Sequence, residues 1–277
     1  MVDFINSNTF RDIAHFVVYP PDGKFWTDDI LKQNAVIYTQ VGPNLDTVLN
    51  NLRFSNRKYI LITHTADWFV NKHMFETRPK CIVKWFAECT DYEHPDLIPI
   101  PIGLSPHKDS DKGSWDVEWF MQEKNLERLR VKPKNDNVLY CTWNYINNIR
   151  ARTGVLKTLR NNGIECLWDR LGQEEGPGEY KSWYEYLENA SQYRFHVSPA
   201  GAGFDSHRTW DALYMGCFPI VIKHPTFKFT LPIIQVNNWG EVTLDLLHSY
   251  LNKEHNMEQL YMSYWTNRIF NEFNKLL

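Results

Sequence analysis

Short apolar segments alternate with segments of helical pattern along most of the chain. Near-continuous apolar runs are typical of strands that are buried on both faces, as in a parallel sheet covered by helices. The runs that fit this description are AVIYTQ, YILITHT, CIVKWFA, LIPIPIG, VLYCTW, IECLW, FHVSP and FPIVI. This alternation of strands and helices predicts an α/β fold.

A chain of 277 residues is long enough for one large domain or two medium ones. Its most polar stretch runs from His107 to Asn137, after which a new strand begins. We therefore expect a boundary near Lys134, with an N-terminal domain of residues 1–134 and a C-terminal domain of residues 135–258.

Residues 259–277 have the pattern of an amphipathic helix. Polar residues separate apolar ones at Leu260, Tyr264, Ile269 and Phe273. We expect this helix to pack back on the N-terminal domain.

The charge pattern bears on possible partners. A net charge of -3, with basic and acidic residues interspersed, gives no broad basic face, so we expect no nucleic-acid partner. The apolar runs are far shorter than the roughly 20 residues that span a bilayer, and residues 1–10 lack a signal-peptide layout. We expect a cytoplasmic protein that is not secreted and has no membrane span.

Candidate chemistry gathers around FHVSPAGAGFDSHRTWDALYMGCFPIVI, residues 195–222. A strand ending at Val197 would lead into a loop at the carboxyl edge of the sheet, where open α/β sheets bind ligands. Gly201 and Gly203 would allow positive φ or close approach of a ligand. Asp205 or Ser206 would cap the next helix, whose N-terminus favours an anion.

Arg208 and Asp211 share one face of that helix. The arginine suits a diphosphate and the carboxylate suits a ribose diol, although the two could equally form a solvated ion pair. Arg150 and Arg152 begin a second helix after the strand VLYCTW. Two arginine-bearing turns between strand and helix favour a nucleotide site.

The segment SPAGAGFDSHRTWDALYMGCFPIVI resembles the signature of exostosin-like glycosyltransferases. The shared features are a Pro-x-Gly loop, Ser-x-Arg, an acidic residue before Ala-Leu, and Gly-Cys-x-Pro before an apolar strand. The resemblance implies the GT-B architecture, which consists of two Rossmann-like domains with a cleft between them. It also implies that Arg208 holds the donor diphosphate and Asp211 the ribose; the family usually has Glu where this chain has Asp.

The chain further resembles the short members of this family in large algal viruses, which have no membrane anchor. That likeness implies a UDP-sugar donor, with UDP-xylose as the first candidate, and an oligosaccharide or glycoprotein acceptor. It implies inverting transfer to a sugar hydroxyl, with no bound metal or cofactor and, for a viral protein, action in the host cytoplasm.

Inverting transfer needs a general base near the acceptor hydroxyl. The strand YILIT ends in HTADW, which places His64 and Asp67 just outside the strand, with Trp68 available to stack on a sugar. We expect Asp67 to be the base, with His64 as its rival and Glu88 as a third candidate. An Asx-type turn that only closes the strand is the structural alternative.

Two other functions remain open. Asp109 and Asp111 form a D-x-D pattern of the kind that grips a divalent ion and a diphosphate, but they lie in a hydrophilic loop rather than directly after a strand. A non-catalytic module that binds carbohydrate or nucleotide would have the same fold and the same candidate donor site.

Overall fold

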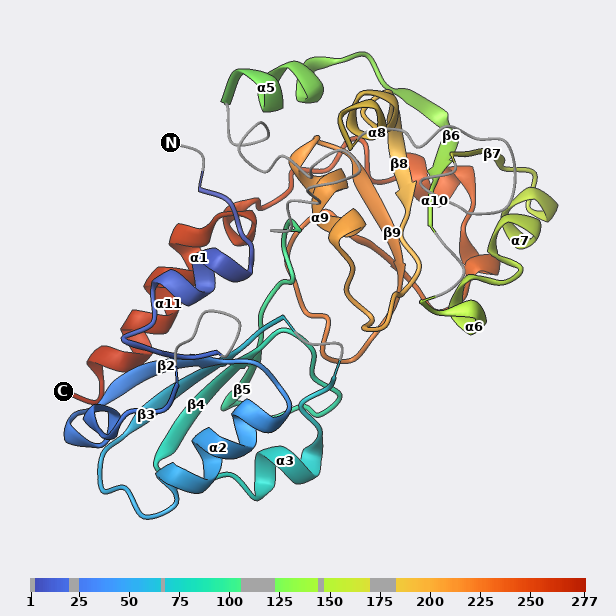
Figure 1. Cartoon of the computed structure of the whole chain (residues 1–277). Coiled ribbons are helices and arrows are strands. Elements are labelled where there is room, and N and C mark those ends of the chain that lie inside the picture. The colour runs from blue at the N-terminus through green and yellow to red at the C-terminus, as the bar shows by residue number, and fades with distance from the viewer. Residues whose placement is uncertain (1–2, 20–24, 66–67, 106–122, 144–146, 170–182) are drawn as a thin grey trace. The chain divides into compact units, whose positions relative to one another are not determined.

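The computed structural model describes residues 3–19, 25–65, 68–105, 123–143, 147–169 and 183–277. The chain forms two compact units, and each is described by itself (Figure 1). The β1–β5 unit comprises Ile5–Ile102, Pro225–Lys228 and Tyr261–Leu277. The β6–β10 unit comprises Met1–Phe4, Gly103–His224 and Phe229–Leu260. The chain thus changes unit after Ile102, whereas the sequence analysis places the boundary near Lys134.

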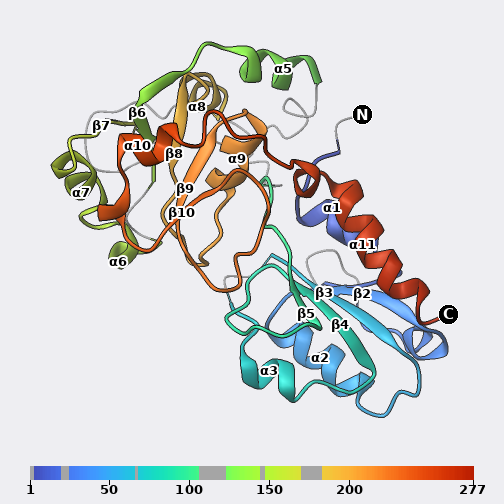
Figure 2. The ribbon, with the colours of Figure 1, turned by 180° about the vertical axis from the view of Figure 1, so that it is seen from behind.

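The β1–β5 unit is built on a five-stranded parallel sheet in the order β1-β2-β3-β4-β5. Its strands are β1 (Phe16–Val18), β2 (Ala35–Thr39), β3 (Tyr59–Thr63), β4 (Ile82–Ala87) and β5 (Leu97–Pro99). Every residue of β2 and β3 is buried, as the continuous apolar runs predict. Figures 1 and 2 show α2 (Pro43–Leu52) and α3 (Lys72–Glu76) on one face of this sheet, and α1 (Ser7–Asp12) and α11 (Met262–Asn274) on the other.

The C-terminal helix α11 contacts β3 and α1 of the β1–β5 unit. At its end, Asn34 Nδ2 donates a hydrogen bond of 2.7 Å to the carbonyl of Leu276. Its buried residues are Met262, Trp265, Ile269 and Phe273. The expected apolar stripe is therefore wrong in its first half, because Trp265 rather than Tyr264 faces the core, and Leu260 lies in the preceding 3₁₀ turn η4 (Glu258–Leu260).

The β6–β10 unit has a second parallel sheet in the order β10-β9-β8-β6-β7. The strands are β6 (Asn135–Cys141), β7 (Glu165–Trp168), β8 (Tyr193–Val197), β9 (Phe218–Ile222) and β10 (Ile234–Val236). The helices are α5 (Glu123–Val131), α6 (Ile149–Arg152), α7 (Val155–Asn161), α8 (Trp183–Ala190), α9 (His207–Tyr214) and α10 (Leu244–His248). Leu139 and Cys141 join a core with residues of α7 and α10. Tyr140, between them, lies near Tyr186 of α8 on the other face.

The α/β fold with parallel sheets is confirmed, and the expected apolar runs coincide with β2 to β9. The three-residue edge strands β1 and β10 were not expected. The 3₁₀ turns η2 (Asp28–Lys32) and η3 (Trp239–Glu241) complete the described elements.

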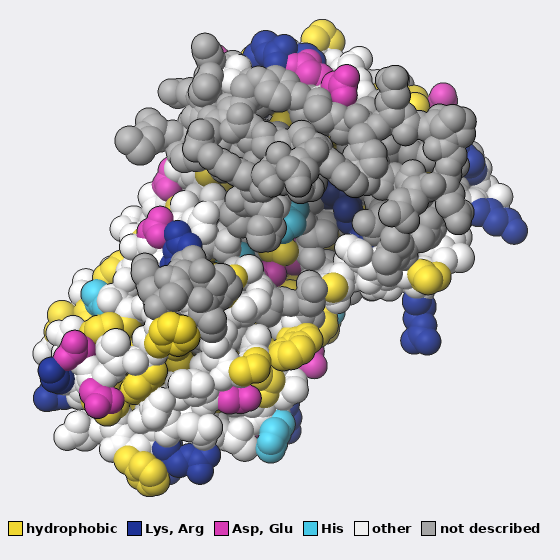
Figure 3. Space-filling model, viewed as in Figure 1, with side chains coloured by type: hydrophobic (Ala, Val, Ile, Leu, Met, Phe, Trp, Pro, Cys, Tyr) yellow, Lys and Arg dark blue, Asp and Glu magenta, His cyan; other side chains and the backbone are white. Residues whose placement is uncertain are grey.

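The described surface has no broad basic area on the face shown in Figure 3, where Lys and Arg side chains are scattered among Asp and Glu. No helix in the described ranges combines the length and the apolar character that a bilayer crossing requires.

Candidate functional site

The loop between β8 and α9 is tied to the first turn of α9 by a cluster of hydroxyls. Ser198 Oγ lies 2.9 Å from Ser206 Oγ and 2.8 Å from Thr209 Oγ1, and all three residues are buried. The indole Nε1 of Trp210 donates to both carboxylate oxygens of Asp205, at 3.0 and 2.9 Å. Ser206 holds the N-cap position but makes no side-chain capping bond. The start of α9 is therefore held rigidly at the carboxyl edge of the sheet.

The two loop glycines do not have the positive φ that the sequence analysis allows for. Gly201 provides room instead, because a Cβ there would lie 3.3 Å from Nη2 of Arg152. The backbone of this loop also accepts two hydrogen bonds from α6 and its cap: Asn148 Nδ2 donates to Gly201 at 2.8 Å, and Arg152 Nε donates to Ala200 at 3.0 Å. A neighbouring side chain, rather than a ligand, thus accounts for the glycine at 201. Gly203 is buried in the same loop.

The two arginines at the start of α6 differ sharply. Arg150 is exposed, whereas Arg152 is 1% exposed and runs to the loop after β8. Burial, and to a smaller extent the nearby positive charge of Arg208, lowers the pKa of Arg152 to about 10. A guanidinium from α6 and one from α9 therefore lie close enough to repel each other.

Arg208 is partly exposed as a residue, yet its Nε atom is enclosed and has no hydrogen-bond partner. Burial lowers its pKa. Asp211 is 1% exposed, and only Oδ2 is bonded, by the Tyr186 hydroxyl at 3.2 Å; Oδ1 has no partner. The structure records no ion pair between Arg208 and Asp211, so the solvated ion pair that the sequence left open is not formed.

Burial raises the pKa of Asp211 to about 7, although the Tyr186 hydrogen bond and the positive charge of Arg208 both act to lower it. Near neutral pH this carboxyl is therefore only partly ionised and offsets only part of the charge of the two arginines.

This edge of the β6–β10 sheet can hold an anion. Arg152 and Arg208 together place two partly desolvated positive charges at the carboxyl ends of parallel strands, and the N-terminus of α9 points its N–H groups there. Thr142, directly after β6, is 3% exposed and its hydroxyl has no partner. The sequence pattern did not single out Thr142 or Tyr186. The position of Thr142 just after the strand VLYC was the available signal, while nothing in the sequence pairs Tyr186 with Asp211.

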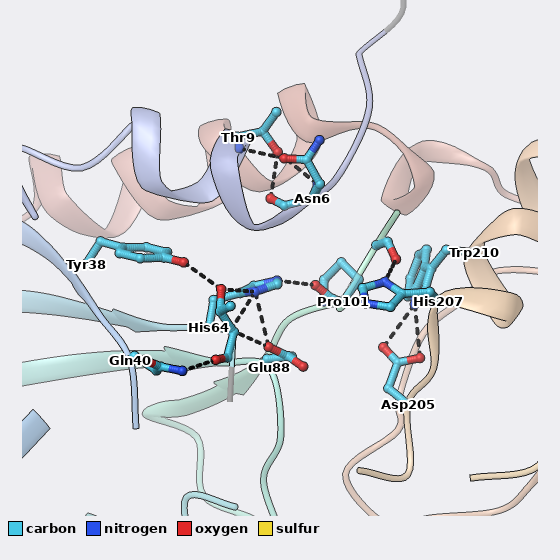
Figure 4. A network of polar contacts seen from close by, with 12 residues as sticks. Asn6, Thr9, Tyr38, Gln40, His64, Glu88, Pro101, Asp205, His207 and Trp210 are labelled. Carbon is cyan, nitrogen blue, oxygen red and sulfur yellow. Dashed lines mark hydrogen bonds and ion pairs between the residues drawn. The ribbon is translucent and has the colours of Figure 1, made fainter. Parts of the chain in front are cut away.

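In the β1–β5 unit, His64 is 2% exposed and both of its ring nitrogens are engaged (Figure 4). Nε2 lies 3.1 Å from the carbonyl of Pro101, and Nδ1 lies 2.8 Å from the backbone N of Thr65. The contact with Pro101 requires a proton on Nε2, and Nδ1 then faces both the N–H of Thr65 and the Glu88 carboxylate. Glu88, 6% exposed, places Oε2 3.1 Å from Nδ1 and accepts the same N–H of Thr65 at 2.7 Å.

Thr65 is held in an unusual backbone conformation, with φ of 64°. Its hydroxyl lies 3.0 Å from that of Tyr38, and Gln40 donates to its carbonyl. The end of β3 is thus braced by Tyr38, Gln40, His64 and Glu88 around a strained residue. Asp67, the expected base, lies outside the described residues, and the D-x-D at Asp109 and Asp111 does too. Within the described ranges, no group of three His, Cys, Asp or Glu side chains could hold a metal ion.

Trp68 is 61% exposed and lies against Gly42, the N-cap of α2. Gly42 has φ of 128° and ψ of -153°, a combination that essentially only glycine adopts. A Cβ there would also lie 3.0 Å from Trp68 Cζ3. The indole therefore has a fixed support and an open surface on which a sugar ring could stack.

Gly42→Ala is expected to lower the free energy of unfolding by about 2–3 kcal/mol, because it adds backbone strain and displaces Trp68. Gly163→Ala is the matched control, since Gly163 has φ of 76° with open space around it and should cost about 1 kcal/mol. Urea unfolding of both variants measures the difference. Equal losses would mean that the Trp68 contact does not constrain this position.

Comparisons with known proteins leave the family open. No protein-family model matches the sequence, and no curated protein matches it. One similar solved structure is the spinosyn rhamnosyltransferase SpnG complexed with spinosyn aglycone. It is 12% identical, and the match covers 87% of this chain and 70% of that chain with a TM-score of 0.39, which is too low to establish a shared fold. The class of the protein therefore rests on its own two parallel sheets, which define two Rossmann-like α/β units.

Proposed function

We propose that this chain is a glycosyltransferase that takes its sugar from a nucleoside diphosphate sugar bound by the β6–β10 unit. The supporting observation is the pair of partly desolvated arginines, Arg152 and Arg208, with the enclosed Nε of Arg208 unpartnered. A diphosphate placed there would satisfy that donor and relieve the repulsion between the two guanidinium groups.

The same arginines suit the chemistry of transfer. When the bond between the anomeric carbon and the diphosphate breaks, negative charge develops on the leaving diphosphate. Fixed guanidinium groups and the N-terminus of α9 would stabilise that charge without a metal ion. Asp211 is assigned to the ribose, as the resemblance to exostosin-like enzymes implies. Because its carboxyl is enclosed, the ribose reaches it only after nearby side chains move.

The finer assignments rest on that resemblance. The donor is a UDP-sugar, with UDP-xylose first, and the transfer is inverting and directed to a sugar hydroxyl of a glycan or glycoprotein in the cytoplasm. The acceptor is assigned to the β1–β5 unit, where Trp68 offers a stacking surface. Asp67 is our candidate base, ahead of His64, because both ring nitrogens of His64 are engaged.

The first test is thermal unfolding with UDP, GDP, ADP, CMP and their sugar conjugates, with and without EDTA. A ligand at about a hundred times its dissociation constant should add roughly 2.7 kcal/mol to the free energy of unfolding. We expect a UDP-selective rise in melting temperature that EDTA does not remove. The absence of a shift with every nucleotide would refute the proposal, and a shift that requires Mg²⁺ would refute its metal-independent form.

The alternative is a binding module without turnover. The engagement of both nitrogens of His64 counts against one candidate base only, because a general base needs a reachable nitrogen. Release or transfer of radiolabelled sugar from UDP-xylose separates the two functions. Tight UDP binding with no sugar release under any acceptor would identify a binding module.

A further inference from the structure

A pocket of about 440 Å³ lies in the β1–β5 unit, beside the edge strand β5. Its walls come from the segment that precedes β5, from β5 itself, from the returning segment Pro225–Lys228 and from α11. Its volume is in the range of pockets that bind small molecules. None of its lining residues belongs to the candidate donor site or to the group around His64.

One positive charge in this pocket has no acidic partner. Lys228 and Glu93 pair with each other. Arg268 of α11 has no ion pair or hydrogen bond within the described part of the chain, and its guanidinium lies over the ring of Trp265, 5.7 Å from the centroid. A guanidinium fixed on an aromatic ring and open to a pocket offers a planar fork of donors that matches a carboxylate.

The lining of the pocket also includes aromatic and apolar side chains. Tyr92 and His94 stack on each other with ring centroids 6.2 Å apart and an angle of 28°, and Leu97 and Pro99 of β5 lie beside them. Stacked aromatic and proline surfaces pack well against the face of another ring. The pocket therefore combines an aromatic and apolar surface that can contact a ring with a guanidinium whose N–H donors can bind an anion.

An extended peptide is a poor occupant, although β5 is an edge strand. Leu97 already donates its N–H to the carbonyl of His94 at 3.0 Å, and Pro99 has no N–H. The backbone N–H of Ile98, between them, points towards β4 because successive residues of a strand alternate in direction. A peptide added as a strand would thus find no donors along this edge.

We propose that this pocket binds a six-membered ring that carries one carboxylate, with Arg268 holding the carboxylate and the Tyr92–His94 wall facing the ring. Such a ligand is either an aromatic acid or a sugar acid, since both carry the same anion and present a ring face that can stack on an aromatic side chain. The site does not depend on the proposed donor site, because it shares no residue with it.

The test uses the full chain and four probes in calorimetric titrations: benzoate, glucuronate, and the neutral counterparts benzyl alcohol and glucose. We expect at least one acid to bind saturably and its neutral counterpart to bind at least tenfold more weakly. Benzoate alone would identify an aromatic acid as the ligand class, and glucuronate alone a sugar acid. Failure of both acids to saturate, or equal binding of the neutral rings, would overturn the proposal.

Arg268→Gln should weaken binding of the preferred acid at least tenfold, whereas Arg57→Gln, at an exposed arginine of the same unit, should not change it. If the glutamine variant loses its fold with the Trp265 contact, Arg268→Lys keeps a cation there but not the fork, and should bind severalfold more weakly. Unchanged binding in a folded Arg268 variant would overturn the proposal. UDP titrated into the same samples reports the donor site separately, so failure of one site is distinguishable from failure of the other.

Discussion

Arg208→Met is expected to abolish measurable UDP binding and, at the same time, to stabilise the protein without ligand. The affinity should fall at least about a hundredfold, because the buried donors of a guanidinium that bind a diphosphate contribute about 3 kcal/mol. The free energy of unfolding should rise by about 1–3 kcal/mol, because methionine fills similar space without a desolvated charge facing Arg152. Urea unfolding with and without UDP measures both effects.

Two further variants test whether these effects are specific to Arg208. Arg160→Met removes an exposed arginine of the same unit and should change the free energy of unfolding by less than about 0.5 kcal/mol, with UDP binding intact. Arg152→Met removes the donor to the Ala200 carbonyl and should destabilise the protein as well as weaken binding. If Arg208→Met destabilises the protein and still binds UDP, Arg208 is a structural residue.

If removing a side chain makes the protein more stable, that side chain serves a function such as ligand binding and not the stability of the fold. Most buried polar atoms in folded proteins are paired. Arg208 Nε, Asp211 Oδ1 and the Thr142 hydroxyl are exceptions that belong to one unit, at or near the carboxyl edge of its sheet. Because these three atoms belong to one unit, we propose that a ligand supplies their partners there; Thr90 Oγ1, an unpartnered hydroxyl of the β1–β5 unit, is not part of this site.

The sequence was sufficient for strands β2 to β9 and for one side of the site. Runs such as YILIT predict β3 because a strand buried on both faces needs no polar residue. Arg208 could be placed at the start of a helix from its neighbours alone. These features are local, so the pattern of neighbouring residues is enough to predict them.

The remaining features depend on contacts between distant residues. Gly201 is required by Arg152, which lies 49 positions earlier, and Tyr186 sets the environment of Asp211 from another helix. The sequence predicted the return of the C-terminal helix, but it could not show that residues 225–228 also return to the β1–β5 unit. No periodicity reports such pairings, so the division into units was placed by polarity and falls elsewhere.

The pH dependence of stability is expected to contain a large contribution from Asp211. Its pKa rises from an ordinary 3.8 to about 7 in the folded protein, so between these values the folded state holds a proton that the unfolded state has lost. The stabilisation that comes from this retained proton is fully present below about pH 4 and is lost as the pH rises towards 7. The interval corresponds to about 4 kcal/mol of the free energy of unfolding.

His196 acts in the opposite direction, because burial lowers its pKa from 6.5 to about 4. Its contribution grows as the pH rises from about 4 to 6.5, so the two groups partly cancel in the whole protein. The informative quantity is therefore the difference between the wild type and Asp211→Asn, which keeps an oxygen for the Tyr186 hydroxyl but cannot ionise.

We expect Asp211→Asn to gain stability over the wild type as the pH rises from 5 to 8, by about 3 kcal/mol, and to level off above pH 8. Urea unfolding at half-unit pH steps measures this difference. UDP should enlarge it, because an anion on Arg208 would also be repelled by an ionised Asp211 and would raise the pKa of that carboxyl further. Parallel curves for the two proteins across this range would mean that Asp211 is ionised in the folded state throughout, and that the charge of Arg208 is neutralised without any ligand.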